Sequence, residues 1–180
     1  MEYRIIIDGD NNVGRKAIHV RYRCDTFNNN EDPRNFDVSW QNVEVDGERC
    51  MIDLWNTSFL DNRNSMYDYN YGFLLVFSVT SRSSFDKIVS LKEEIIKRRK
   101  TSFPPVFVIA GNKIDLEHER QVSLIECQEL ASSLNCSYFD ISAKTGYNVS
   151  SALHQICREI KQMHLAHPNI QNKDSSCRLL

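Results

Sequence analysis

The sequence predicts an α/β domain with a mostly parallel central sheet, one antiparallel hairpin at its edge and helices on both faces. The first observation is a set of short apolar runs, at residues 3–7, 72–80, 106–110 and 138–141, which have the length and composition of strands buried on both faces. The second is that most of these runs alternate with stretches that place apolar residues at helical spacing. Strands that alternate with helices predict right-handed crossovers within one sheet.

The edge hairpin is predicted between the first and second buried strands. Residues 25–35 are rich in Asn and Asp and are typical of a solvated loop. Residues 36–45 alternate in part between apolar and polar side chains, and residues 49–55 return as the antiparallel partner. Asp46 and Gly47 join the two strands and form a strong signal for a tight hairpin turn.

Three helices are predicted after residue 80, at residues 83–99, 124–134 and 149–163. The first and the third carry apolar residues at helical spacing along one face. The helix at 124–134 follows Ser123, with Glu126 three residues later. This spacing predicts a capping box, in which each of the two side chains bonds to the backbone of the other residue.

Composition places the chain among globular proteins with an ordinary charge balance. At 180 residues it suits one domain that buries roughly two thirds of its unfolded surface. With 41% hydrophobic and 26% charged residues and a formal charge of -2, it gives no sign of a nucleic-acid surface. Its six dispersed cysteines lack metal-ligand spacing and favour a reducing compartment. We expect neither a signal peptide nor a membrane span.

Residues 9–17 have the outline of a phosphate-binding loop between a strand and a helix. Gly9 and Gly14 allow the backbone to turn tightly and to aim its N–H groups at phosphate oxygens. The pattern next requires a Lys for the terminal phosphates and a Ser or Thr for magnesium, but the chain has Arg15 and Lys16. Two glycines at this spacing more often form an ordinary turn, so the loop alone does not identify a site. The candidate phosphate-binding residues are Gly9, Asn11, Asn12, Val13, Gly14, Arg15, Lys16 and Ala17.

A stronger signal follows the strand at 106–110, where the chain has Asn112, Lys113 and Asp115. The Asp115 carboxylate can accept hydrogen bonds from the N1–H and the amino group of guanine, which adenine does not offer. Lys113 can lie along the base, and Asn112 can tie its loop to the phosphate loop. The alternative is a polar loop without a ligand, because Asn, Lys and Asp are common loop residues.

Ser142, Ala143 and Lys144 follow the strand at 138–141. The backbone N–H of Ala143 suits the carbonyl oxygen of guanine, and an exposed turn is the alternative. Ligands in such sheets sit at the carboxyl ends of the strands, where all of these loops meet. Because each of these loops follows a predicted parallel strand, we expect them to form one shared pocket.

With these loops established, the chain resembles the Ras-type small GTPases, which have a P-loop NTPase-like fold, over residues 3–163 and in its tail. The loops at 112–115 and 142–144 match that family's base-recognition motifs, and Phe27 stands where the family places an aromatic ring against the base. The resemblance implies a guanine-nucleotide-binding domain at residues 1–163 that takes GTP or GDP. It also implies protein effectors and regulators as partners, no nucleic acid, and a monomer.

This chain differs from the family at the residues that bind phosphate and magnesium and that position the attacking water. Arg15 stands at the place of the phosphate-binding Lys, and Lys16 at the place of the magnesium-binding Ser or Thr. Arg34 replaces a Thr that closes over magnesium, and Asn56 replaces an Asp that orients the ion. Leu60 replaces the Gln that positions the attacking water. The resemblance therefore identifies these places without their usual chemistry.

These changes remove oxygen ligands for a divalent cation and put positive charge in its place, which leaves Mg²⁺ binding in doubt. Arg15, Lys16 and Arg34 can supply charge to a phosphate chain. Leu60 cannot hydrogen-bond a water, so no catalytic residue is intact and we expect very slow or absent GTP hydrolysis. The alternative is a non-catalytic scaffold with nucleotide bound permanently or not at all. Asp115 disfavours a third hypothesis, an ATP-directed phosphotransferase.

The family's effector surface is matched here more by position than by sequence. Asp37 matches an acidic contact residue of the family, whereas Asn35, Phe36 and Ser39 depart from it. Partner binding by addition to the edge strand remains available, but the family's partners are not implied. The effector-like residues are Asp32, Pro33, Arg34, Asn35, Phe36, Asp37, Val38, Ser39 and Trp40.

The chain ends in Cys177, Arg178, Leu179 and Leu180, which form a CaaX prenylation signal. The terminal Leu favours a geranylgeranyl group on Cys177. Residues 164–180 have the polar composition of a flexible tether, with little basic support and no second nearby cysteine. One lipid gives reversible attachment, so we expect the protein at the cytoplasmic face of a membrane, with the plasma membrane as the first choice.

Overall fold

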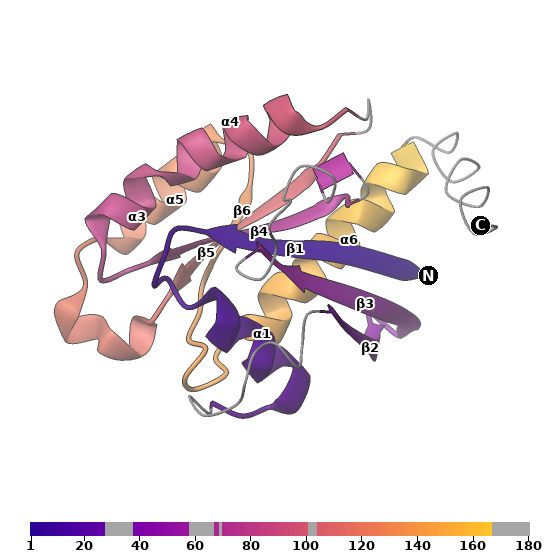
Figure 1. Ribbon diagram of the computed structural model, residues 1–180, viewed down its shortest axis with the longest axis horizontal. Helices are drawn as coiled ribbons and strands as arrows, with labels where there is room; N and C mark the ends of the chain where they lie inside the picture. The colour runs from indigo at the N-terminus through magenta and orange to yellow at the C-terminus, as the bar shows by residue number, and fades with distance from the viewer. Residues whose placement is uncertain (28–37, 58–66, 69, 101–103, 167–180) are drawn as a thin grey trace.

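The computed structural model describes residues 1–27, 38–57, 67–68, 70–100 and 104–166 (Figure 1). Within them, six strands form one sheet in the order β2-β3-β1-β4-β5-β6. β2 pairs antiparallel with β3, and all other pairs are parallel, which confirms the predicted fold class. The strands are β1 (Glu2–Gly9), β2 (Val38–Val45), β3 (Glu48–Asn56), β4 (Gly72–Ser78), β5 (Val106–Asn112) and β6 (Ser137–Asp140). The α-helices are α1 (Arg15–Cys24), α3 (Arg82–Asp86), α4 (Ile88–Arg98), α5 (Leu124–Ser133) and α6 (Val149–Ala166).

Two hydrophobic cores, one on each face of the sheet, hold the helices in place. α1 and α6 cover one face, and α3, α4 and α5 cover the other (Figure 1). Every residue of β4 and β5 is buried. Along β4, Leu74 and Val76 enter the core beneath α6, whereas Phe73 and Phe77 enter the core beneath α4. This burial on both faces explains why these strands are continuous apolar runs.

The predicted hairpin joins β2 and β3. Asp46 and Gly47 have φ angles of 53° and 80°, the left-handed backbone that the two central residues of a type I′ turn require. Arg158 of α6 donates to the Asp46 carboxylate at 2.8 Å, and Lys161 donates to Glu48 at 2.6 Å. These exposed ion pairs attach the edge hairpin to α6. The first two residues of the predicted strand, 36 and 37, lie outside the described residues.

The predicted helix at 83–99 is divided at Lys87 into α3 and α4. Ser81 caps α3 by accepting from the Ser84 N–H, and the Ser84 hydroxyl donates to the Ser81 carbonyl at 2.8 Å. At the division itself, the Ser90 hydroxyl donates to the Lys87 carbonyl at 3.0 Å, and serine side chains that bond to nearby backbone groups compete with regular helical hydrogen bonds. The apolar spacing therefore located the helical segment but not its division.

α6 continues to Ala166, beyond the predicted helix end at residue 163. His164 is buried and packs edge-on against Tyr71, with ring centroids 5.8 Å apart. This contact adds a further turn to the buried face of the helix. The helix thus enters the first residues of the predicted tether, and residues 167–180 lie outside the described part of the chain.

The described cysteines, Cys24, Cys50, Cys127, Cys136 and Cys157, are free thiols that are wholly or partly buried. Burial raises the pKa of the Cys157 thiol to about 12, so this thiol stays protonated at neutral pH. None of the described helices combines the length and the apolar character that crossing a bilayer requires.

The capping box at the start of α5 gives a test of local stability. The Ser123 hydroxyl accepts from the Glu126 N–H at 3.3 Å, and the Glu126 carboxylate accepts from the Ser123 N–H at 2.9 Å. We expect Ser123→Ala to lower the free energy of unfolding by about 1 kcal/mol in urea denaturation. Ser133→Ala, at the other end of the same helix, is the matched control and should have a much smaller effect.

The same measurement has a defined pH dependence. Hydrogen bonds from Ser123, followed by the bond from Arg82, lower the pKa of Glu126 from 4.5 to about 2. Because the folded pKa is depressed, the contribution of Glu126 is present above the unfolded value and is lost as the pH falls through this window. The stability difference between wild type and Ser123→Ala should shrink between pH 4.5 and 2. A difference that stays constant down to the lower pH would contradict this assignment.

Candidate functional site

The side chain of Asn112 joins the predicted loops into one site. Asn112 is buried at the end of β5. Its Nδ2 donates to the Val13 carbonyl at 2.8 Å, and its Oδ1 accepts from the N–H of Ala143 at 3.0 Å. The bond to Val13 is the link to the phosphate loop that the sequence analysis anticipated. The bond to Ala143 extends this link to the third loop, but it uses the N–H that we predicted for the carbonyl oxygen of guanine.

Both glycines of the phosphate loop stand where a side chain would collide with its neighbours. Gly14 has a φ angle of +97°, and a Cβ there would lie 2.4 Å from Asn112 Nδ2. A Cβ on Gly9 would lie 2.2 Å from the Val76 carbonyl oxygen of β4. Because a contact of this length requires the backbone to shift, the two glycines allow the loop to sit against β4 and β5.

Asp115 lies in a 3-10 helix, η3 (Ile114–Glu119), which the sequence analysis did not predict. Ser142 Oγ donates to Asp115 Oδ1 at 2.6 Å, and Lys144 Nζ lies 3.9 Å from Oδ2. The Asp115 side chain is 15% exposed. Each carboxylate oxygen has two acceptor sites, so Asp115 is oriented by Ser142 and retains the capacity to accept further bonds. Lys113, with a φ angle of 71°, makes the turn into η3.

Arg21 of α1 holds the loop of Ala143 and Lys144, and sequence reasoning missed it. Its Nε donates to the Ala143 carbonyl at 2.9 Å, and its Nη2 donates to the Lys144 carbonyl. Its Nη1 donates to the Asp25 carbonyl at 2.8 Å. No local pattern distinguishes this arginine from its basic neighbours. Phe27, just beyond this clamp, is 43% exposed, and its predicted place against a base stays a prediction.

The phosphate loop leads directly into α1. Gly14 precedes the helix, which has no side-chain cap and no acidic residue in its first turn. The N-terminus of such a helix suits an anion, because its backbone N–H groups and its dipole both favour negative charge. The other predicted phosphate-binding residues differ in exposure: Asn11, Asn12 and Lys16 are exposed, Ala17 is half-buried and Val13 is buried.

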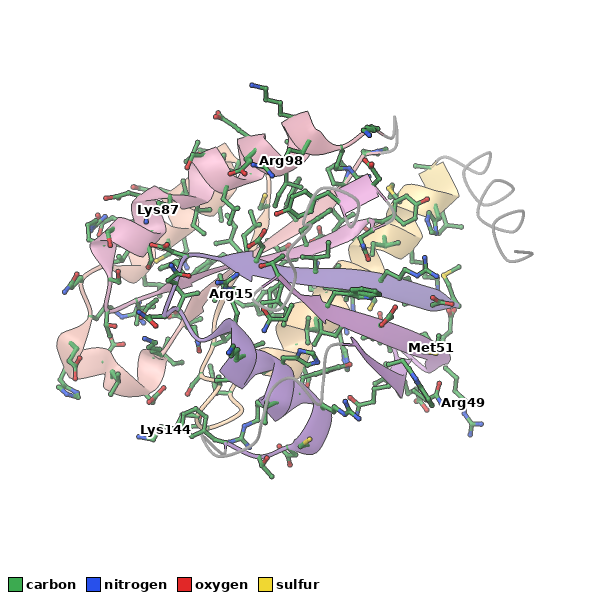
Figure 2. All side chains as sticks on the ribbon, in the orientation of Figure 1. Arg15, Arg49, Met51, Lys87, Arg98 and Lys144 are labelled. Carbon is green, nitrogen blue, oxygen red and sulfur yellow. The ribbon has the colours of Figure 1, made fainter. Side chains whose placement is uncertain are left out.

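Arg15 makes contacts that the sequence analysis did not foresee. We expected this side chain to supply charge to phosphate, but its guanidinium is only 6% exposed and points into the protein. Its Nη1 donates to Thr57 Oγ1 at 2.6 Å and lies 3.6 Å from Asp8 Oδ1. Figure 2 shows Arg15 between the carboxyl end of β1 and the start of α1. The guanidinium is therefore already engaged by protein oxygens.

Asp8 is a fully buried carboxylate next to the phosphate loop, and sequence reasoning also missed it. Its Oδ1 accepts from the Gly9 N–H and from the Thr57 hydroxyl, each at 2.8 Å. Its Oδ2 accepts from the Tyr67 hydroxyl at 2.7 Å. A single acid at the end of an apolar strand was the only available signal. The bonds connect the ends of β1 and β3 with Tyr67, which follows the segment 58–66 in the chain.

The side chains beside the phosphate loop do not form a suitable set of ligands for magnesium. Lys16 and Asn56 stand at places where the resemblance expects magnesium ligands, but an ammonium group cannot ligate a cation and Mg²⁺ prefers carboxylate oxygens. The carboxylate of Asp8 already accepts three hydrogen bonds and faces Arg15. Across the described ranges, no three His, Cys, Asp or Glu side chains are grouped to hold a metal ion.

Part of the predicted site lies where the structure gives no description. The residues concerned are Asp32, Pro33, Arg34, Asn35, Phe36, Asp37, Leu60 and Cys177. The remaining effector-like residues, Val38, Ser39 and Trp40, lie in β2 at the edge of the sheet. Trp40 is 65% exposed there.

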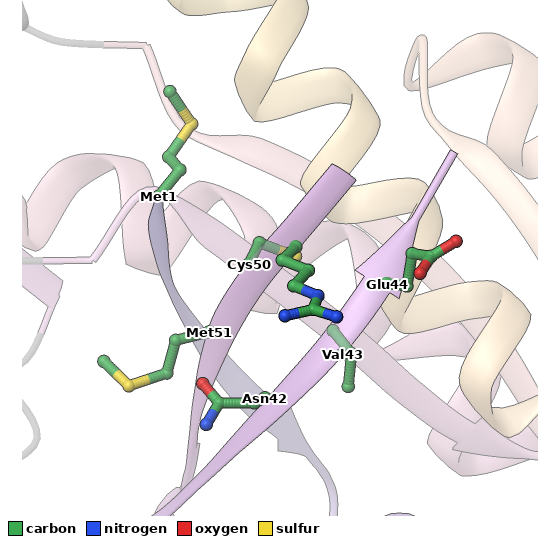
Figure 3. Close-up of a pocket in the computed structure, with 7 residues that line it drawn as sticks. Met1, Asn42, Val43, Glu44, Cys50 and Met51 are labelled. Atoms are coloured by element: carbon green, nitrogen blue, oxygen red, sulfur yellow. The ribbon is translucent and has the colours of Figure 1, made fainter. Parts of the chain in front are cut away.

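Two surface hollows lie away from these loops. The one in Figure 3, of about 590 Å³, is lined by Met1 and by residues of β2 and β3 such as Asn42 and Cys50. Another, of about 900 Å³, lies among α4, α5, α6 and the start of β5. Both are at the amino ends of the parallel strands, whereas ligands of such sheets bind at the carboxyl ends. The loops joined by Asn112 therefore remain the candidate site.

Comparison with known proteins leads to the same family. The model of the Ras family matches residues 4–162. The chain is 32% identical, over 192 aligned residues, to the Ras-like protein rasS of Dictyostelium discoideum, and the match covers 99% of this chain and 98% of that relative. The fold, the base-recognition loops and both comparisons agree. The chain therefore belongs to the Ras family of small GTPases, which bind guanine nucleotides and act in signalling.

Proposed function

We propose that the protein is a membrane-anchored guanine-nucleotide-binding signalling protein that has kept base recognition and has lost most of its capacity to hydrolyse GTP. The observation that carries this proposal is the Asn112 side chain, which bonds to the phosphate loop through Val13 and to the third loop through Ala143. The three loops are thus assembled around one position at the carboxyl ends of β1, β5 and β6. Guanine and phosphate each have a loop of matching chemistry there.

Base specificity rests on Asp115. Its carboxylate is held by the Ser142 hydroxyl and is mostly shielded from solvent. Guanine supplies two N–H donors at the edge that meets this carboxylate, whereas adenine supplies none and would leave it unpaired. A site built to accept hydrogen bonds rejects an analogue that lacks the donors. GTP and GDP are therefore the proposed ligands.

Slow hydrolysis follows from the groups around the phosphates. Phosphoryl transfer needs positive charge on the phosphates and an oriented water. Lys16 and Arg34 offer charge without metal ligation, and Leu60 cannot orient a water. We therefore propose that the nucleotide is bound without the family's Mg²⁺ ligands.

We further propose that residues 164–180 tether residues 1–163 to a membrane through a geranylgeranyl group on Cys177. The cytoplasmic face of the plasma membrane is the proposed location, and a monomer is the proposed state. Protein effectors and regulators would meet the edge strand β2, where Trp40 is 65% exposed.

A second candidate function is a non-catalytic scaffold that does not exchange nucleotide. The observation that favours it is the buried Arg15 guanidinium, which already contacts Thr57 and Asp8. A phosphate loop whose main cation is satisfied by protein oxygens does not depend on a ligand to offset that charge. In the form of the scaffold hypothesis without nucleotide, stability is therefore the same with and without added GDP or GTP.

Nucleotide binding separates the two candidates. We expect GDP to be extracted from the purified protein or to raise its melting temperature, and Asp115→Ala to weaken GDP binding by several kcal/mol because a buried bidentate pair is lost. Asp115→Asn should shift preference toward xanthine nucleotides, since an amide can donate to the C2 carbonyl of xanthine. Glu117→Ala, in the same η3 helix, is the control. If neither GDP nor GTP is extracted and neither raises the melting temperature, the signalling function is wrong and the scaffold hypothesis is favoured.

Hydrolysis is a separate prediction. Single-turnover phosphate release should be very slow, should not depend on magnesium, and should not be restored by Leu60→Gln alone, because the magnesium ligands remain missing. A variant that combines all the family's residues should recover magnesium-dependent release: Arg15→Lys, Lys16→Ser, Arg34→Thr, Asn56→Asp and Leu60→Gln. Rapid, magnesium-dependent release by the wild type would show that our interpretation of these positions is wrong.

Membrane attachment is tested in cells with the full chain. Cys177→Ser should move the protein from the membrane fraction to the soluble fraction, because it removes the prenyl acceptor. Cys24→Ser, which changes a thiol outside the prenylation signal, is the matched control and should leave the distribution unchanged. Equal membrane fractions for wild type and Cys177→Ser would exclude prenylation as the anchor.

A further inference from the structure

A buried carboxylate accompanies the cation of the phosphate loop. Asp8 is fully buried at the end of β1, and its Oδ1 lies 3.6 Å from Arg15 Nη1. The Thr57 hydroxyl bridges the pair, because it accepts from Arg15 at 2.6 Å and donates to Asp8 at 2.8 Å. Tyr67 binds the other carboxylate oxygen at 2.7 Å. Asp8 is thus held firmly beside Arg15 by groups from three segments.

The charge arrangement at the start of α1 makes this pairing necessary. Arg15 and Lys16 are the first residues of the helix, and no acid occupies its first turn. Cations are unfavourable at the positive end of the helix dipole. Arg15 is also buried, where an uncompensated charge is costly. Asp8 therefore neutralises Arg15 without any ligand.

We propose, on the basis of the function proposed above, that Asp8 sets the phosphate preference of the nucleotide site. Because the Arg15 guanidinium is buried against Thr57 and Asp8, a nucleotide phosphate at the start of α1 gains its charge only in competition with these groups, and it lies near the fixed negative charge of Asp8. Burial limits the screening of that charge by solvent and salt. Each added phosphate therefore gains less from Arg15 and is repelled more by Asp8. The site therefore binds GTP no more tightly than GDP, and without the Asp8 charge it would bind GTP more tightly.

Asp10 offers a matched comparison across Gly9. Its carboxylate accepts from Lys87 Nζ at 2.7 Å, and its side chain is 23% exposed. The hydrogen bond from Lys87 lowers the pKa of Asp10, so this acid is charged at neutral pH. Figure 2 shows Lys87 where α3 meets α4, and the charge of Arg15 contributes less to the lowered pKa of Asp10 than Lys87 does. Lys87 and solvent screen the charge of Asp10, so removing it should affect phosphate preference much less.

The experiment measures the affinities of GMP, GDP and GTP by calorimetry, in EDTA, for wild type, Asp8→Asn and Asp10→Asn. In the wild type, GTP should bind no more tightly than GDP. Asp8→Asn should raise the affinity for GTP relative to GDP by about tenfold or more, because a unit charge near a partly buried phosphate acts strongly. Asp10→Asn should change this ratio far less.

The outcomes separate this proposal from the proposed function. If all three nucleotides bind but GTP binds the wild type about tenfold more tightly than GDP, the role of Asp8 is excluded while guanine recognition stands. Equal shifts of the ratio in Asp8→Asn and Asp10→Asn exclude it as well. If Asp8→Asn does not fold, the wild-type series decides by itself. If none of the three nucleotides binds, the role of Asp8 and the proposed function are both wrong.

Discussion

The amide of Asn112 is the interaction on which the site depends. It is buried at the end of β5, and both of its polar atoms are used, one on the Val13 carbonyl and one on the Ala143 N–H. Loss of either bond would leave a buried polar group without a partner, which is costly. Gly14 has to be a glycine partly because a Cβ there would strike this same side chain. The phosphate loop and the base loops therefore share one fixed reference point.

The sheet explains why that reference point is rigid. β5 is buried along its whole length, with one core under α1 and α6 and the other under α3, α4 and α5. Parallel strands bring the loops after β1, β5 and β6 to the same edge. Arg21 then clamps the Ala143 loop from α1. Packing on both faces thus supports hydrogen bonds that would be weak in an isolated loop.

Base recognition and phosphate chemistry depend on different groups, so one can change without the other. The proposed base recognition depends on the Asp115 carboxylate, which the Ser142 hydroxyl orients on one side of the site. Phosphoryl transfer needs a metal or equivalent charge and an oriented water. On the phosphate side of the site, Arg15 is paired with Asp8. Asn112 links the two ends of the pocket through its bond to Val13.

The sequence by itself determined the fold class, the hairpin turn, the α5 capping box and the family to which the loops at 112–115 and 142–144 point, because those features depend on residue type and short spacing. It did not reveal the Asp8–Arg15–Thr57 cluster or the Arg21 clamp. Arg15 and Thr57 are 42 positions apart, and Arg21 and Ala143 are 122 apart. Their contacts arise only when β1, β3 and α1 pack together, so tertiary structure alone decided that the phosphate loop contains its own buried counter-charge.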